Sequence, residues 1–160
     1  MERRSKQKWE NGDIFLVPKS DGGYTVAQVL SYEVEAMNSA VCAFTLRRAS
    51  KTEKDTAPTM DETISIQYIT IDLLDSGDWP VVGHAPEIEF RQLFDLVGHR
   101  AKQFIGTVTE GSGIMDDFIN ACFGLEPWHD WYDPLYLDKL LLSPDKKPAL
   151  VVYKSEEASN

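Results

Sequence analysis

The sequence predicts an α+β fold, in which a twisted antiparallel β-sheet, begun by a meander at the N-terminus, carries two or three helices packed on one face. Three observations support this class: two strand-like segments within residues 12–30, a third at 39–48, and one apolar stripe of helical spacing at 114–123. Alternation with period two is typical of strands, whereas apolar pairs that recur every four residues are typical of a helix. The chain therefore needs both a sheet and helices.

The first two strands are predicted to form a hairpin within residues 12–30. An apolar run and an alternating run flank the segment Ser20-Asp-Gly-Gly23. The two glycines reach positive φ without a steric penalty, and Asp21 can accept a local backbone hydrogen bond, so a tight turn is expected there. Residues 39–48 predict a third strand, antiparallel to the second because the break at 35–38 is short.

Further strands are predicted from alternation and β-branched content. They lie at 64–72, 81–82 and 149–153, and residues 103–109 also have a strand-like pattern. The prediction for residues 86–100 is ambiguous. Their apolar residues have helical spacing, but the flanking helix breakers would limit any helix to a short one.

Two helices are predicted near the C-terminus. The clearer one begins with Ser112 as N-cap and ends at Gly124. The other is expected to open at Asp133-Pro134 and to end before Pro144, because aspartate is a good N-cap and proline suits the first helical position.

The length of 160 residues predicts a single domain that spans residues 1–160, with a mobile loop at 49–62 and a frayed tail at 155–160. The basic N-terminus is followed by no signal-peptide pattern, and no apolar run approaches the ~18 residues of a membrane span, so a cytoplasmic location is expected. Cys42 and Cys122 lie inside apolar patterns and are predicted to be reduced, buried thiols.

The charge distribution disfavours some partners and favours others. The net charge is −10, and residues 55–90 carry eight acidic side chains without one Lys or Arg, as residues 103–138 carry seven. Such stretches repel nucleic acids and anionic membranes, so neither is expected as a partner, whereas a basic partner would be attracted. The alternative that this charge only maintains solubility stays open.

No catalytic, cofactor or metal site is predicted from the motifs, and the protein is not expected to be an enzyme. Gly111-Ser-Gly113 precedes a helix but lacks the lysine of a phosphate-binding loop, and Ser112 lacks the setting of a hydrolase nucleophile. The three histidines, His84, His99 and His129, are far apart in sequence, so a metal site would have to be assembled from distant elements.

The segment 126–133 stands out because it concentrates aromatic and acidic side chains. Large rigid aromatic residues provide contact area, and carboxylates orient a basic partner. Two interpretations stay open: a partner-binding surface, or a core plug in which Trp128 and Trp131 fill the interior. The predicted partner-binding residues are Trp128, His129, Asp130, Trp131, Tyr132 and Asp133, helped by Asp75 and Asp78 from another turn.

About the first hundred residues resemble a known family. Lys8-Trp-Glu-Asn-Gly-Asp-Ile-Phe15, the hairpin with Pro18 and Asp21-Gly-Gly-Tyr24, Gln28-Val-Leu30, and then Gly77-Asp-Trp-Pro-Val-Val-Gly83 follow in the order of the immunity protein 26 family of bacterial polymorphic toxin systems. The resemblance implies a small cytoplasmic, β-rich α+β protein that binds and neutralises a cognate toxin, and it implies no catalytic residues and no cofactor.

The predicted function is thus that of an immunity protein, which occludes the active surface of a secreted toxin domain. The toxin is expected to be basic, for instance a nuclease, because the chain is acidic. Two alternatives are a small cytoplasmic hydrolase that uses Asp/His chemistry in a cleft, and an adaptor that binds a peptide at a sheet edge.

Overall fold

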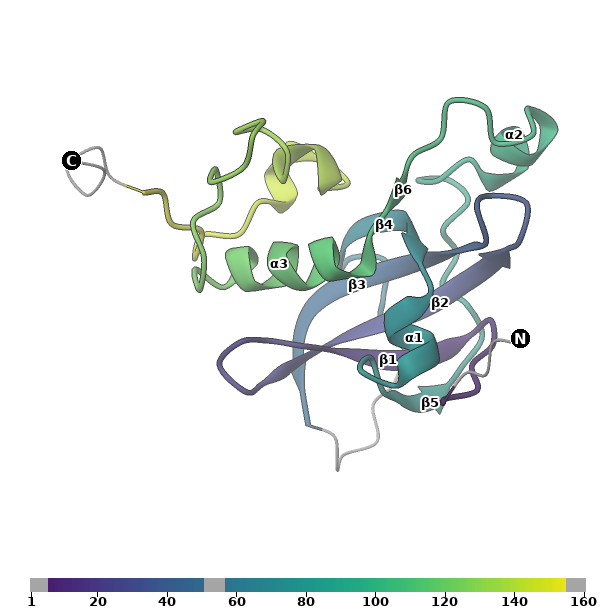
Figure 1. The fold of residues 1–160 in the computed structure, drawn as a ribbon, viewed down its shortest axis with the longest axis horizontal. Helices are drawn as coiled ribbons and strands as arrows, with labels where there is room; N and C mark the ends of the chain where they lie inside the picture. The colour runs from purple at the N-terminus through teal and green to yellow at the C-terminus, as the bar shows by residue number, and fades with distance from the viewer. Residues whose placement is uncertain (1–5, 51–56, 155–160) are drawn as a thin grey trace.

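The computed structural model describes residues 6–50 and 57–154 and is built around a six-stranded sheet of order β5-β1-β2-β3-β4-β6 (Figure 1). The predicted α+β class with a mostly antiparallel sheet is confirmed. The strands are β1 (Asp13–Pro18), β2 (Tyr24–Glu33), β3 (Ser39–Ala49), β4 (Thr63–Thr70), β5 (Val81–His84) and β6 (Thr109–Glu110). The α-helices are α1 (Asp72–Ser76), α2 (Leu96–Ala101) and α3 (Ser112–Cys122).

The strands β1 to β3 form the predicted meander, and β4 pairs antiparallel with β3. Phe15 on β1 faces Ala27 on β2, which in turn faces Phe44 on β3. The β1–β2 turn is closed by the Lys19 N–H, which donates to the Gly23 carbonyl over 2.7 Å, while Gly22 has φ +94°. β5 pairs antiparallel with the outer side of β1, and β6 pairs parallel with β4.

The first face of the sheet is covered by α1, α3 and the segment after α3 (Figure 1). Phe15, Phe44 and the fully buried Trp79 pack against one another with ring centroids 5.2–6.2 Å apart. The predicted apolar stripe of α3 is confirmed, because it buries Met115, Phe118, Ile119 and Cys122 in the same cluster. Cys42 and Cys122 are free and buried, as predicted, and burial raises the pKa of both thiols.

The second face of the sheet is covered by the chain that links β5 to β6. Val41, Ile66 and Tyr68 project from this face and pack with Phe90 and Leu96. The ambiguous segment 86–100 therefore contains the start of one short helix, α2, on the opposite face from α3. The predicted strand at 103–109 is wrong except for its last residue, which begins β6: residues 103–106 form turns, with Gln103 and Phe104 at φ +53° and +61°.

Two predictions at the C-terminus are wrong. In place of a helix from Asp133, the chain makes turns and two short 3₁₀ segments, η1 (Asp138–Leu140) and η2 (Pro144–Lys146). The Asp133 carboxylate accepts the Leu135 N–H over 2.9 Å, as an N-cap does, but the bonds that follow, such as that from the Leu140 N–H to the Leu137 carbonyl, join residues three apart and give 3₁₀ turns. The predicted strand at 149–153 adds nothing to the sheet and makes one isolated bridge between Pro127 and Val152.

The strand predicted at 64–72 is too long at its end, because β4 ends at Thr70 and helix α1 begins at Asp72. The helix ends at Ser76, and Gly77, with φ +85°, is its C-cap. Of the predicted mobile loop at 49–62, residues 51–56 lie outside the described residues, and residues 59–62 form a turn in which the Thr59 N–H donates to Glu62. The predicted tail at 155–160 also lies outside them. In the described part of the chain, no helix is long and apolar enough to cross a membrane.

Candidate partner-binding surface

The aromatic and acidic segment 126–133 leaves the end of α3 and divides into buried and accessible side chains. Trp128 has none of its surface exposed, and its ring lies 5.8 Å from that of Phe118 on α3 and 5.3 Å below the Lys147 ammonium. Tyr132 is fully exposed and Asp130 is exposed. Trp128 thus anchors the segment in the core, while Asp130 and Tyr132 face solvent.

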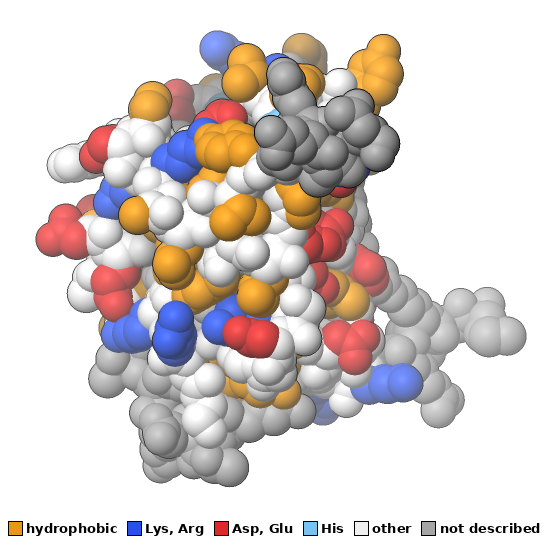
Figure 2. All heavy atoms as spheres, turned by 90° about the vertical axis from the view of Figure 1, so that its left-hand side faces the viewer, with side chains coloured by type: hydrophobic (Ala, Val, Ile, Leu, Met, Phe, Trp, Pro, Cys, Tyr) orange, Lys and Arg blue, Asp and Glu red, His pale blue; other side chains and the backbone are white. Residues whose placement is uncertain are grey.

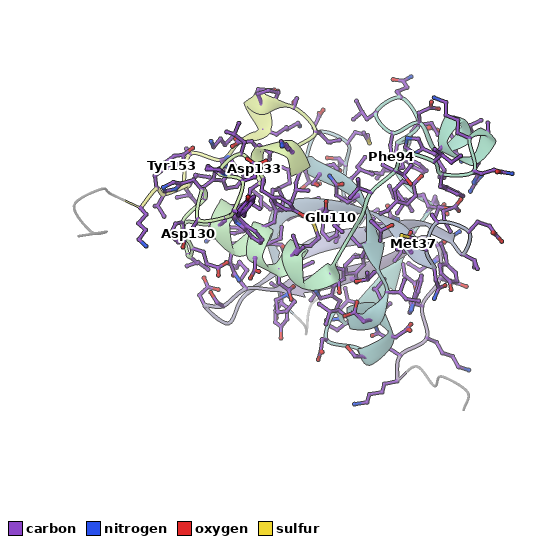
Figure 3. All side chains as sticks on the ribbon, turned by 45° about the horizontal axis from the view of Figure 1, so that its top comes forward. Met37, Phe94, Glu110, Asp130, Asp133 and Tyr153 are labelled. Atoms are coloured by element: carbon purple, nitrogen blue, oxygen red, sulfur yellow. The ribbon has the colours of Figure 1, made fainter. Side chains whose placement is uncertain are left out.

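Asp133 and His129 have partners within the chain. Asp133 accepts a hydrogen bond from the Lys139 ammonium at 2.6 Å, which holds the pKa of this carboxyl below its usual range. The His129 ring lies 5.1 Å from the Tyr153 ring. Figure 3 shows Asp130, Asp133 and Tyr153 at one end of the molecule, away from Met37 and Phe94.

Trp131 forms part of a second aromatic contact. Its half-buried ring stacks on Tyr136 with centroids 5.1 Å apart and an angle of 13° between the planes. The Tyr136 hydroxyl donates to Glu110, and burial, together with this carboxylate, raises the pKa of Tyr136 to about 12. The stack fixes one face of the Trp131 indole.

A pocket of about 270 Å³ lies between this segment and α3. It contains three carboxylates, and apolar side chains complete it. Burial raises the pKa of Asp117, and burial together with the charge of Asp117 raises that of Glu126. Among the described residues no cation pairs with Asp117, Glu126 or Asp130. The lining residues are Asp117, Ala121, Leu125, Glu126, Pro127, Asp130 and Trp131.

The other two predicted residues lie on the turn that follows α1. Asp75 accepts a hydrogen bond from the Trp9 indole N–H at 2.7 Å, and Asp78 is exposed. Between them and the pocket lies Asp116 on α3, which accepts the Trp79 indole N–H at 2.8 Å. Burial raises the pKa of Asp116 to about 6, and the charges of Asp117, Asp78 and Asp72 add to the effect.

Sequence reasoning missed the contribution of α3 to this site. Asp117 and Ala121 are four residues apart and share one face of the helix, so they meet the segment that folds back after Gly124. The pair Asp116-Asp117 in an amphipathic helix was the available signal, but no local pattern predicts that the following segment folds back on α3.

The histidines and sheet edges bear on the two alternative functions. His84 bonds to Asp13 at 2.9 Å and His99 to Tyr68 at 2.8 Å. Within residues 6–50 and 57–154, no histidine bonds to a serine or cysteine side chain. The edge strand β5 has four residues, and its Val81 N–H already donates a hydrogen bond to the Gln7 side-chain oxygen over 2.9 Å. Little of this edge is therefore available to pair with an added peptide strand.

Accessible aromatic residues beside an acidic pocket are features of surfaces that bind other proteins. Comparison with known proteins is consistent with this class. The family model of immunity protein 26 matches residues 10–99, and the chain belongs to that family. No curated protein and no solved structure matches the chain.

Membership of the family gives the chain an immunity function and implies a cognate toxin as its partner. It also points to a role other than catalysis. The matched region spans β1 to β5 and part of α2, whereas the pocket is formed entirely by residues after position 99.

Proposed function

We propose that this immunity protein binds its cognate toxin domain through the segment 126–133 and the adjoining pocket, and that it neutralises the toxin by covering its active surface. The toxin surface it fits is basic, as the nucleic-acid-binding surface of a nuclease is. The observation that carries the proposal is the pocket of about 270 Å³ with an aromatic wall and three carboxylates that pair with no cation within residues 6–50 and 57–154.

The pocket has the chemistry to receive a Lys or Arg side chain. Burial raises the pKa of Asp117 and of Glu126, and the charge of Asp117 adds to the effect on Glu126, while no cation in the described part of the chain offsets it. A guanidinium or ammonium group placed between them restores the lost stabilisation and can lie against the Trp131 indole, an arrangement that favours cations. Desolvated pairs of this kind are typical centres of tight interfaces.

The predicted partner-binding residues then divide by role. Asp130, Trp131 and Tyr132 touch the toxin, because they are accessible around the pocket. Trp128, His129 and Asp133 hold the segment in place through contacts inside the chain. Asp78, and beside it Asp75, extend the acidic surface along the turn after α1 and guide the approach of a basic partner.

One side of the molecule carries charges of both signs. Figure 2, which views the protein from the left-hand side of Figure 1, shows hydrophobic side chains mixed with both acidic and basic ones. The net charge of −10 attracts a basic partner from a distance, whereas on a face of mixed sign specificity has to come from groups in direct contact.

The test uses the toxin domain encoded beside the gene for this chain, produced in a catalytically inactive form. Its affinity is measured by calorimetry for the wild type and for Asp130→Asn with Glu126→Gln, which keeps the shape of the pocket but removes two charges. We expect the affinity to fall at least about tenfold, because charge pairs in direct contact couple by more than about 1.5 kcal/mol. Asp61→Asn, an exposed acid outside the pocket, is the control and should bind as the wild type does.

Two further measurements separate binding from folding. Tyr132→Ala should weaken binding while the melting temperature stays unchanged, because the side chain is fully exposed. Binding by the wild type should weaken as salt rises, and the charge-deleted pocket should show a smaller dependence. Full affinity in both pocket and Tyr132 variants would place the interface elsewhere, and failure of the wild type to bind the toxin would reject the proposal.

A further inference from the structure

A second cluster of polar side chains lies at the β5 edge of the sheet, where β5 pairs with the start of β1. Asp13, the first residue of β1, faces His84, the last residue of β5. Glu10 precedes β1 and brings a second carboxylate to the same imidazole. One ligand atom each from Glu10, Asp13 and His84 lies within 4.8 Å of the other two.

The backbone holds two of these groups firmly. The Glu10 N–H donates to Asp13 Oδ2 over 2.9 Å, which leaves Oδ1 of the same carboxylate turned toward the His84 ring. Gly12 sits between them at φ +91°, and a Cβ on it would lie 2.6 Å from the Ala85 carbonyl oxygen. Only glycine permits this close approach of the β5 end to the start of β1.

The distances match those around a small metal ion. Asp13 Oδ1 lies 2.9 Å and Glu10 Oε1 lies 3.6 Å from His84 Nδ1. Ligands about 2.0–2.2 Å from one ion are themselves about 3–4 Å apart, so the three atoms need only small movements to share one. The Glu10 side chain is 75% exposed and free to make them, whereas the Asp13 side chain is 10% exposed and fixed.

The charges also favour a dication over a proton. A proton shared by Asp13 and His84 leaves one of the two carboxylates without a compensating charge, whereas a divalent cation compensates both. An imidazole nitrogen with two carboxylate oxygens suits zinc and its first-row neighbours, because magnesium and calcium prefer oxygen ligands alone. The half-exposed imidazole leaves the outer side open for water as a fourth ligand.

We propose that Glu10, Asp13 and His84 bind a first-row divalent cation, with Zn²⁺ as the best fit. The ion ties the edge strand β5 to the start of β1, so its binding stabilises this edge of the sheet. The site is separate from the toxin-binding pocket and stands or falls independently of the proposed function.

The test is a calorimetric titration of the untagged full chain with ZnCl₂. We expect one saturable site in the wild type, and a loss of affinity of about tenfold or more in Glu10→Gln and in His84→Gln, since each removes a ligand. The matched control is Glu87→Gln, which removes an exposed carboxylate that acts on His84 through its charge alone. The control should bind within about twofold of the wild type, because no ligand is lost.

Each outcome decides the matter. Absence of a saturable site in the wild type, or wild-type affinity in His84→Gln, would overturn the proposal. An equal loss in Glu10→Gln and Glu87→Gln would show attraction by charge without coordination, which also overturns it. Glu10 is exposed and its variant folds on that ground, so the test does not depend on the stability of the His84 variant.

Discussion

Replacing Asp116 by asparagine should make the protein more stable at neutral pH. Asp116 lies on α3, is partly buried, and accepts the Trp79 indole N–H at 2.8 Å. Burial raises its pKa from 3.8 to about 6, although the hydrogen bond opposes this change. The charged carboxylate is therefore disfavoured in the folded state. The asparagine carbonyl can accept the same hydrogen bond without a charge.

The direction with pH follows from where the proton binds. Above pH 6 Asp116 is charged in both the folded and the unfolded chain, so the folded state carries the full free-energy cost of burying that charge. As the pH falls from about 6 to 3.8, the folded state takes up a proton that the unfolded state does not, so this group adds stability toward low pH. Asparagine binds no proton, so the advantage of the variant disappears over that same interval.

The magnitude follows from the same pKa values. A rise from 3.8 to about 6 corresponds to roughly 3 kcal/mol for a fully shielded carboxylate. Asp116 is partly exposed, so solvent screening reduces this value, and we expect a gain of about 1 kcal/mol at pH 7.5. For a chain of this size, that gain raises the melting temperature by about 2–4 °C.

The assay is urea unfolding, followed by tryptophan fluorescence, at several values between pH 4 and pH 8. The wild type is compared with Asp116→Asn and with Asp61→Asn, which removes the same charge from an exposed site and should leave the stability unchanged. A stability difference between the wild type and Asp116→Asn that stays constant from pH 4 to pH 8 would refute the reasoning. So would a less stable variant at pH 7.5, because the hydrogen bond to Trp79 would then outweigh the burial of the charge.

Two further variants test the packing and an ion pair. Trp128→Ala should lower the free energy of unfolding in urea by about 3–5 kcal/mol, since it empties a fully buried site against Phe118, and wild-type stability would show that the segment 126–133 is not anchored there. Arg100→Gln removes the guanidinium that lies 2.7 Å from the Glu33 carboxylate and holds the pKa of Glu33 below its usual value. The variant should therefore lose about 1 kcal/mol of stability near pH 7 in the same assay. Because a lowered pKa gives stability that is lost as the pH falls through it, this second difference should vanish in acid, and a difference that persists there would exclude the ion pair as its cause.

The parts of the fold that were predicted correctly depend on short-range signals. The β1–β2 turn needs positive φ at Gly22, which the sequence supplies locally. The stripe of α3 is complete within eleven residues and requires no knowledge of what it packs against. In both cases, neighbouring residues determine the conformation.

The parts that were predicted wrongly depend on distant contacts. Leu137 and Leu140 are buried as the helical spacing required, and the Asp133 carboxylate accepts the Leu135 N–H as an N-cap does. A three-residue spacing also suits a 3₁₀ turn, however, and the chain continues as η1. In the candidate site, composition singled out 126–133 but could not separate Trp128 from Trp131. Their difference arises because the segment folds back on α3, which no local pattern encodes.

The part of the chain that matches the family and the part that forms the pocket pack against each other. The match ends at residue 99, yet the matched Trp79 is covered by α3 and bonded to its Asp116. The unmatched part must therefore be present to close the core of the matched sheet. In the pocket that the same part forms, Ala121 is buried and constrained by packing, whereas Leu125 and Asp130 are exposed. Substitutions at the exposed positions leave the core intact, so under the proposed function they are where one immunity protein can be adapted to another toxin.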